Sequence, residues 1–328
     1  MRTRPRHPHL VHLLRARGLA LALCMLGGLS ACEPMAEPDD GPPPLQDGWT
    51  RLEAPPLHLP AGTEKFFCIF GTFEELGGIA DAIPWTSSAS LHLDHLLLRA
   101  APDDVPYADG EVADCQDVGA WWYERPPLVE GAGRDPSQPG LGLPEGVAFP
   151  IEGGQRYVLD GHYINVTVED EEVQLLMDVR VISEEEILWP AGAYSLDLGG
   201  ALNIPAHDTT TIPFECTWQD EVTLLSIAPH MHEFGTEFTL DWIHANGGTD
   251  RLLDIEEFGR GKDDDRDPTS APPVLTVSPG DIFRTACTWV NEGDFDLGFP
   301  DEMCTTIGMG YPLPGGAACS GGGPITGP

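Results

Sequence analysis

Along much of the chain, hydrophobic and polar residues alternate in short runs and do not follow helical spacing. A period of two places one face of a strand on a core and the other toward solvent. Such runs, alternating or rich in β-branched residues, are separated by turns of proline and glycine. They predict strands at 66–70, 90–98, 157–167, 173–182, 209–214, 222–228, 237–244, 274–277 and 282–290. The pattern indicates an all-β protein.

Composition supports this interpretation, because 32 prolines and 38 glycines leave few windows for a long helix. About 280 residues of this character are more than one sandwich usually holds. We therefore expect two tandem β-sandwiches. Their expected bounds are 49–186 and 187–322, with a seam at 183–186 that leads into 189–192.

The N-terminal region predicts export. Residues 1–31 contain five arginines and no acidic residue, and the apolar run 19–29 is too short to cross a bilayer with ease. The sequence Leu-Ser-Ala-Cys that ends at Cys32 resembles a bacterial lipobox, which implies cleavage before Cys32 and lipidation of its thiol. The alternative is an ordinary cleaved signal followed by an incidental cysteine. Segment 32–48 predicts a flexible tether. We expect a protein anchored at the bacterial cell envelope, at the outer membrane, or an extracellular one.

The charge of the chain is strongly acidic, with a formal net charge of −36. Five of the 17 basic residues lie in the predicted signal, so 12 remain in the exported part against 53 acidic residues. Such a surface repels nucleic acid and anionic membranes. We therefore expect no nucleic-acid partner, and membrane contact only through the lipid anchor.

The cysteines fit an oxidising compartment. Of eight, Cys24 lies in the predicted signal and Cys32 is the proposed anchor, which leaves an even number. Six cysteines predict three disulfides, and they allow 15 pairings between which the sequence does not choose. The remaining six are Cys68, Cys115, Cys216, Cys287, Cys304 and Cys319. No CxxC occurs among them, which argues against zinc ribbons and thioredoxin chemistry.

Two segments far apart in sequence carry the strongest metal-binding pattern. His230 and His232 are two residues apart, so on a strand both imidazoles point to one face and can hold one ion. Met303, in the sequence Asp-Glu-Met-Cys, would add a thioether. A His2Met set favours Cu(I) over zinc or hard cations. The alternative for Met303 is a methionine that fills a gap in the core.

A second histidine group lies in the first half of the chain. On a regular strand His92 and Asp94 would face one way and His95 the other, and His162 follows in a later predicted strand. Adjacent residues can share a metal ion where a strand bulges. The alternative is that these histidines are half-buried and hydrogen-bonded without a metal.

Five short segments occur in one order along the chain. They are Leu143–Phe149, Tyr157–Tyr163, His230–His232, Gly280–Thr288 and Asp301–Cys304. Together they resemble the copper type II, ascorbate-dependent monooxygenases, the group of peptidylglycine α-hydroxylating monooxygenase and dopamine β-monooxygenase. The resemblance covers about 66–319. Each segment alone is modest, but five in the family's order are hard to obtain by chance.

The resemblance implies two tandem antiparallel β-sandwich domains of the jelly-roll kind, with one copper ion each. The second copper, where O2 binds and a C–H bond is hydroxylated, would take His230, His232 and Met303 as its ligands. The family's disulfides would fall on the pairs Cys68–Cys115, Cys216–Cys319 and Cys287–Cys304.

The first, electron-transferring copper matches less well. The family has two adjacent histidines and a third in a later strand. His95 matches the second position and His162 the third, but Asp94 stands at the first. A carboxylate disfavours Cu(I) relative to imidazole. His92 would replace Asp94 as a ligand if the strand bulges.

The resemblance also bears on the substrate. The arginine with which peptide-hydroxylating members bind a substrate carboxylate falls on Ala228 here. The tyrosine and asparagine that help to hold the peptide fall on Ile307 and Thr305. These replacements argue against a peptidylglycine substrate. The acidic surface would tolerate a cationic or neutral amine-like substrate better than an anion.

Three hypotheses follow for the function. The first is a copper-dependent monooxygenase with one or two copper ions, which hydroxylates a small organic substrate with O2 and a one-electron donor such as ascorbate. The second is a non-catalytic surface copper-binding lipoprotein that retains only the His2Met site. The third is a structural surface domain without a metal.

Overall fold

The structure is a computed structural model of the chain. It describes residues 42–86, 93–119, 121–124, 127–131, 140–165, 167–232, 234–258, 274–299 and 301–327. The predicted signal peptide, Cys32 and His92 lie outside the described residues. For 93–95 only the backbone is described.

The first half of the described chain is built of strands. They are β1 Thr50–Glu53, β2 Leu57–Leu59, β3 Glu64–Thr72, β4 Gly77–Thr86, β5 Leu93–Ala100, β6 Val112–Asp114, β7 Val129–Gly131, β8 Val147–Ile151, β9 Arg156–Ile164, β10 Glu171–Val173, β11 Leu175–Ile182 and β12 Trp189–Pro190. The short helices here are η2 Cys115–Asp117, α1 Trp121–Glu124 and η3 Glu184–Glu186. Two five-stranded sheets result, in the orders β1-β11-β4-β8-β12 and β6-β3-β9-β5-β7, and β10 pairs with β2.

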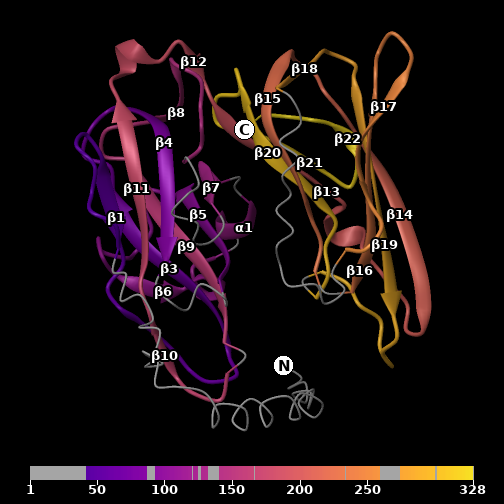
Figure 1. Cartoon of the computed structure of the whole chain (residues 1–328), viewed down its shortest axis with the longest axis horizontal. Coiled ribbons are helices and arrows are strands. Elements are labelled where there is room, and N and C mark those ends of the chain that lie inside the picture. The colour runs from indigo at the N-terminus through magenta and orange to yellow at the C-terminus, as the bar shows by residue number, and fades with distance from the viewer. Residues whose placement is uncertain are drawn as a thin grey trace, which may run out of the picture. The chain divides into compact units, whose positions relative to one another are not determined.

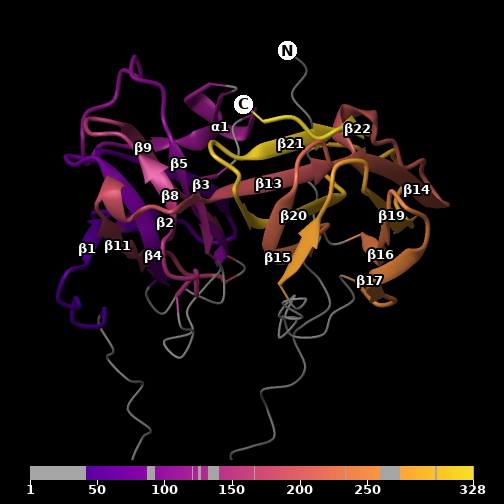
Figure 2. The same cartoon turned by 90° about the horizontal axis from the view of Figure 1, so that it is seen from above.

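The second half repeats this plan. Its strands are β13 Gly192–Asp197, β14 Asp208–Thr217, β15 Val222–His230, β16 Gly235–Ile243, β17 Thr249–Ile255, β18 Leu275–Val277, β19 Ile282–Asn291, β20 Thr305–Tyr311, β21 Ala317–Ser320 and β22 Gly323–Pro324, with η4 Gly199–Ala201. The sheet orders are β18-β15-β20-β13-β21 and β17-β16-β19-β14-β22. Figures 1 and 2 show β15, β20 and β13 side by side in the first of these sheets.

Each half has its own hydrophobic core, to which both of its sheets contribute. The first core includes Ile79 and Leu96, and the second includes Phe238, Trp218 and Trp289, all of them at most 1% exposed. Since apolar area removed from water stabilises a fold by about 25 cal/mol per Å², these aromatic side chains are a large part of the stability. The prediction of an all-β protein with two sandwiches is confirmed.

The connection between the halves is short. The carboxylate of Glu186 accepts hydrogen bonds from the backbone N–H and the hydroxyl of Ser183, at 3.0 and 2.7 Å. Strand β12 then pairs in parallel with β8 of the first half, and Ala191 packs in the first core. From Gly192 onward the chain belongs to the sheets of the second half.

One stretch of the chain, 317–324, contributes an edge strand to both sheets of the second half. Strand β21 pairs in parallel with β13, and β22 pairs in parallel with β14. The hydroxyl of Ser320 also donates to the carboxylate of Asp197 at 2.8 Å. The two sheets of this sandwich are therefore closed on one side by neighbouring residues.

Three disulfides join the six predicted cysteines. The bonds are Cys68–Cys115, Cys216–Cys319 and Cys287–Cys304. These are the pairings that the resemblance implied, and disulfides of this kind are typical of proteins from oxidising, exported environments. In the described part of the chain, no helix has the length and apolar character needed to cross a membrane.

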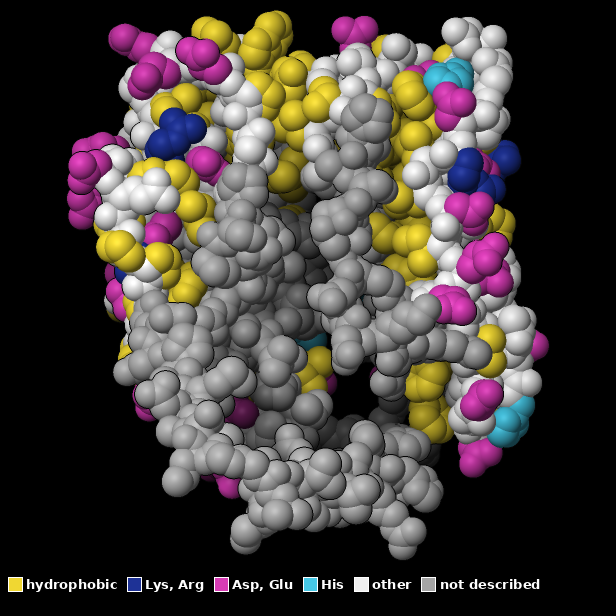
Figure 3. All heavy atoms as spheres, in the orientation of Figure 1, with side chains coloured by type: hydrophobic (Ala, Val, Ile, Leu, Met, Phe, Trp, Pro, Cys, Tyr) yellow, Lys and Arg dark blue, Asp and Glu magenta, His cyan; other side chains and the backbone are white. Residues whose placement is uncertain are grey.

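Among the charged side chains of the face in Figure 3, acidic ones prevail over basic ones. In Figure 3, Asp and Glu side chains are scattered over the described part of the face, whereas Lys and Arg occupy few places. This agrees with the formal net charge of −36.

We predict that Gly192→Ala destabilises the protein, because the backbone approaches Gly192 too closely for a side chain. A Cβ there would lie 1.9 Å from the carbonyl oxygen of Leu313 and 2.8 Å from the backbone nitrogen of Gly316. Overpacking of this kind costs about 1–3 kcal/mol. Urea denaturation measures it, with Gly200→Ala as the control, since nothing lies within 4 Å of a Cβ at Gly200. Equal stabilities of the two variants would contradict the prediction.

Candidate metal centre

The two histidines of the second half lie where β15 ends. Met231 packs into the core at 5% exposure, so alternation along the chain places His230 and His232 on the opposite face. Both imidazoles are half-buried. Their ring centroids are 5.3 Å apart, with an angle of 84° between the ring planes. Two imidazoles this close can bind a common ion.

A hydrogen bond fixes the orientation of the His232 ring. Its Nδ1 lies 3.1 Å from the carbonyl oxygen of Asp301. A carbonyl oxygen only accepts, so Nδ1 carries the proton and Nε2 keeps its lone pair. A backbone carbonyl bound to the second ring nitrogen is the usual support of a metal-ligating histidine.

The backbone of Met303 is anchored beside the same strand end. In the register of β15 with β20, His230 lies directly opposite Thr305, which is two residues after Met303. Met303 is half-buried and its N–H donates to the Glu302 carboxylate at 3.3 Å. The next residue, Cys304, is held to β19 by the disulfide with Cys287. The structure thus brings the two segments that carry the three predicted ligands together.

Glu302 was not identified from the sequence, although it is a buried carboxyl group next to Met303. Its side chain is 0% exposed. Burial raises the pKa of this carboxyl, while hydrogen bonds from the backbone of Phe234 and His232 and from Trp289 lower it. The carboxylate accepts from Phe234 N at 2.7 Å, from Trp289 Nε1 at 3.0 Å and from His232 N at 3.1 Å.

The sheet that carries these histidines contains no cationic residue. Its strands β18, β15, β20, β13 and β21 have no lysine or arginine, whereas Arg251 and Arg284 occur in the other sheet of the same sandwich. Next to His230 on the same face lies Ala228, with Ile307 opposite it. Among the described strands of this sheet, no lysine or arginine is therefore present to pair with an anionic group.

Thr305 supplies a hydroxyl to the same face of the sheet. Because it lies directly opposite His230, its side chain projects on the same side. The residue is 3% exposed, and its hydroxyl oxygen has no hydrogen-bond partner among the described residues. A buried hydroxyl without a partner costs free energy, about 1–3 kcal/mol. Such a group is typical of a place where a ligand completes the hydrogen bonding.

The histidines of the first half lie on adjacent strands. His95 on β5 is directly opposite His162 on β9. The register shifts between Leu93 and His95, so that Asp94 is the extra residue of a bulge. A bulge, the condition under which His92 would replace Asp94 as a ligand, therefore occurs at Asp94 itself.

His162 has partners that sequence patterns did not reveal. Its Nε2 lies 2.8 Å from the carboxylate of Glu64. Its ring stacks on Phe66, with centroids 3.9 Å apart. Glu64 and Phe66 both lie on β3, which pairs with β9 so that Phe66 is directly opposite His162. An ionised Glu64 accepts from Nε2–H, which places the proton of a neutral ring on Nε2.

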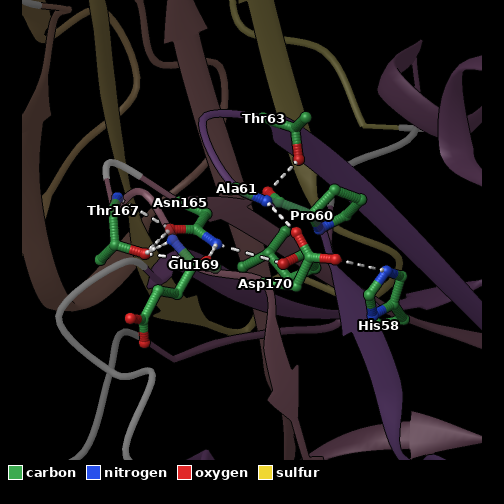
Figure 4. Close-up of polar contacts among 9 residues, drawn as sticks. His58, Pro60, Ala61, Thr63, Asn165, Thr167, Glu169 and Asp170 are labelled. Atoms are coloured by element: carbon green, nitrogen blue, oxygen red, sulfur yellow. Dashed lines mark hydrogen bonds and ion pairs between the residues drawn. The ribbon is translucent and has the colours of Figure 1, made fainter.

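The strand ends that carry Glu64 and His162 are fixed by a polar network, which Figure 4 shows. Asn165, just after β9, donates from its side chain to the carbonyls of Leu59 and Glu169, at 3.1 and 3.0 Å. Asp170 accepts from Ala61 N at 2.8 Å and lies 3.5 Å from His58. His58 is thus an exposed residue at the edge of this network.

One other cluster has donors at metal-ligand spacing. Within the described residues, Cys68, Cys115 and Asp160 place one ligand atom each within 4.8 Å of one another. The two cysteines form a disulfide, so neither offers a thiolate. The carboxylate of Asp160 accepts hydrogen bonds from Arg99 Nε at 3.3 Å and from Trp122 Nε1 at 2.7 Å. This cluster is a structural contact and does not resemble a metal site.

No model of a known protein family matches the chain, and no curated protein sequence matches it. The resemblance to the copper monooxygenases therefore stays a hypothesis based on the motifs.

Proposed function

We propose that this protein is a copper-dependent monooxygenase that hydroxylates a C–H bond of a small organic substrate. The observation that supports it best is the connection between two distant segments. Asp301 and Glu302 bind the His232 residue by its ring and by its backbone, while Thr305 lies opposite His230. The segment with the proposed thioether ligand is thereby held against the pair of imidazoles.

The donors of this region fit copper. His230 and His232 offer imidazole nitrogens from rings 5.3 Å apart, and Met303 offers a soft thioether. This mixture stabilises Cu(I) and tolerates Cu(II). Copper, when bound, supplies the redox chemistry that activates O2. In the net reaction one oxygen atom enters the C–H bond and the other leaves as water, with two electrons and two protons from ascorbate or an equivalent donor.

The residues around the histidines set which substrate binds. We propose that Ala228 and Ile307 form an apolar wall, and that the hydroxyl of Thr305 donates to or accepts from a polar group of the substrate. A carboxylate substrate has no cation to bind in this sheet. Neutral or cationic substrates are therefore expected, and a peptide with a free C-terminal glycine is not.

We propose that the first half contains a weaker copper site, which supplies the second electron of the reaction. Its ligands would be His95, His162 and Asp94, with His92 as the alternative to Asp94. Asp94→His is then expected to lower the dissociation constant of the first-half Cu(I) about tenfold, or about 1.4 kcal/mol, because imidazole is the better Cu(I) donor. Titration with a Cu(I) chelator measures this. Adding His162→Ala to that variant removes the gain if the site is placed correctly. An unchanged affinity in Asp94→His contradicts the assignment.

The rival function is a surface copper-binding lipoprotein without catalysis. Asp94 at a family histidine position favours it, because a weak first site leaves only one electron in the protein. Copper stoichiometry discriminates between the two, since an enzyme holds two reducible ions per chain and the rival holds one, chiefly as Cu(I). The third hypothesis, a structural domain, predicts no bound copper.

Location is a further part of the proposal. We infer that the protein is exported, cleaved before Cys32 and anchored by lipid to the bacterial envelope. The three disulfides support an oxidising compartment. Mass spectrometry of the mature N-terminus distinguishes a lipidated Cys32 from an ordinary cleaved signal.

The function itself is tested by oxygen uptake. Copper-loaded protein is supplied with ascorbate and with panels of neutral, amine and peptide substrates. Uptake that depends on both copper and substrate, with a hydroxylated product by mass spectrometry, supports the enzyme. No substrate-dependent uptake from protein that holds two copper ions contradicts it.

A further inference from the structure

Glu302 occupies an unusual position for a carboxylate. Its side chain is 0% exposed, and no lysine or arginine occurs in the sheet of β20, the strand that it precedes. A buried carboxylate is costly unless hydrogen bonds satisfy it. Here only N–H groups do so.

Those N–H groups come from three separate segments. Two are backbone amides of the turn that follows β15, at His232 and Phe234, 3.1 and 2.7 Å from the carboxylate. The third is the indole of Trp289 on β19, at 3.0 Å. The fourth is the amide of Met303, at 3.3 Å. One side chain therefore joins the histidine turn, a core strand and the methionine segment.

The neighbouring residue adds a second connection. The carbonyl of Asp301 accepts from His232 Nδ1, so that residues 301 and 302 hold the His232 residue by its ring and by its backbone. The ring cannot rotate without breaking the first bond, and the turn cannot shift without breaking the second. Both bonds act on the position of Nε2, the nitrogen available for a metal.

The same sandwich contains a comparable carboxylate remote from the histidines. Asp281 is 4% exposed and accepts from Ala245 N at 2.8 Å, Ser278 N at 2.9 Å and Trp242 Nε1 at 3.0 Å. Both groups therefore bind two loop amides and one indole. Asp281 connects none of the predicted metal ligands, which makes it a matched structural reference.

We propose that Glu302 is a positioning residue for the metal site: it fixes the His232 imidazole and the Met303 segment in the arrangement that binds copper. This inference deepens the proposed function and rests on it. The carboxylate accepts hydrogen bonds from the backbone of both ligand segments, at His232 and at Met303. Its negative charge also lies next to the place where a copper cation would bind, which favours the ion.

Glu302→Gln tests this proposal because it keeps the size of the side chain but replaces one acceptor oxygen by an NH2 donor. At least one of the four N–H groups then loses its acceptor. We expect the Cu(I) dissociation constant of the second-half site to rise about 10–100-fold, as for other outer partners of metal ligands. The EPR spectrum of bound Cu(II) should also change. Asp281→Asn should lower the melting temperature to a similar degree while leaving copper affinity and EPR as in the wild type.

A measurement without metal separates this inference from the proposed function. In the metal-free wild-type protein, nitrogen NMR of the His232 ring should show the Nδ1–H tautomer, and in Glu302→Gln a mixture of tautomers. If wild-type protein binds no copper but the tautomer changes as expected, the proposed function fails while the positioning of His232 stands. If wild-type protein binds copper and Glu302→Gln weakens it no more than Asp281→Asn does, the positioning role is wrong.

Discussion

Replacing His230 by alanine is expected to remove copper from the second half of the protein and to reduce substrate-dependent oxygen uptake to background. The variant retains one imidazole and one thioether, which is too few donors to hold copper in competition with buffer ligands. Since loss of an outer partner alone costs about 10–100-fold in affinity, loss of a direct ligand should exceed about 100-fold, or about 2.8 kcal/mol. A Cu(I) chelator titration and an oxygen electrode measure the two effects.

His244→Ala is the matched control for this experiment. His244 lies in the same sandwich, its side chain is 25% exposed, and its Nε2 is paired with Asp250 at 2.8 Å. It has no place in the proposed site, so copper content and oxygen uptake should be unchanged. Retention of copper by His230→Ala at wild-type affinity would overturn the His2Met assignment, provided that the melting temperature shows a folded variant.

Removal of the disulfide that matters more for stability should matter less for copper binding, and the reverse should hold for the other disulfide of the second half. Cys216–Cys319 spans 103 residues and Cys287–Cys304 spans 17. Loop-closure entropy predicts losses of about 4.7 and about 3 kcal/mol for closures of this length. The double variant Cys216→Ala/Cys319→Ala should therefore be the less stable, as measured by urea unfolding.

The copper affinities of the two double variants are expected to follow the reverse order, with the lower affinity in the more stable variant. Cys304 follows Met303 directly, so Cys287→Ala/Cys304→Ala frees the thioether segment from β19, and the Cu(I) affinity should fall. The Cys216–Cys319 bond lies between β14 and β21, on the side where 317–324 closes the sheets. Its removal should leave the affinity unchanged at a temperature where the variant is folded. A parallel ranking of the two measurements would show that copper binding reports only global stability.

Strands with regular alternation were predictable from sequence. The predicted run 282–290 corresponds to β19, in which buried residues alternate with exposed or half-buried ones over most of the strand. The predicted run 157–167 corresponds to β9, which is buried on both faces and was predictable from its apolar and β-branched residues. Strand β20 was not predicted, although it lies opposite the histidine strand. Its glycines hid the strand pattern, because glycine is depleted in strands. A Cβ at Gly308 would meet the carbonyl oxygen of Ser226 at 2.1 Å and the Tyr194 hydroxyl at 2.5 Å. Tertiary packing requires glycine there, and local propensity does not reveal this.

Those residues of the candidate site that belong to a short sequence motif were predictable from the sequence. His230, His232 and Met303 were found by spacing and resemblance, and Glu302 was overlooked although it is the neighbour of Met303. Its role depends on N–H groups up to 70 residues away, and no local pattern reports them. Glu64 was overlooked for the same reason, since it meets His162 only through the pairing of β3 with β9.

The stretch 317–324, which closes both sheets of the second half, also bears on the order of folding. Its contact between Ser320 and Asp197 joins positions 123 residues apart. Contacts of such long range form slowly, because loop closure must come first. Until the ribosome has synthesised this stretch, both sheets have an open edge. Pairing of β21 with β13 and of β22 with β14 is therefore expected to be a late step in the folding of this sandwich.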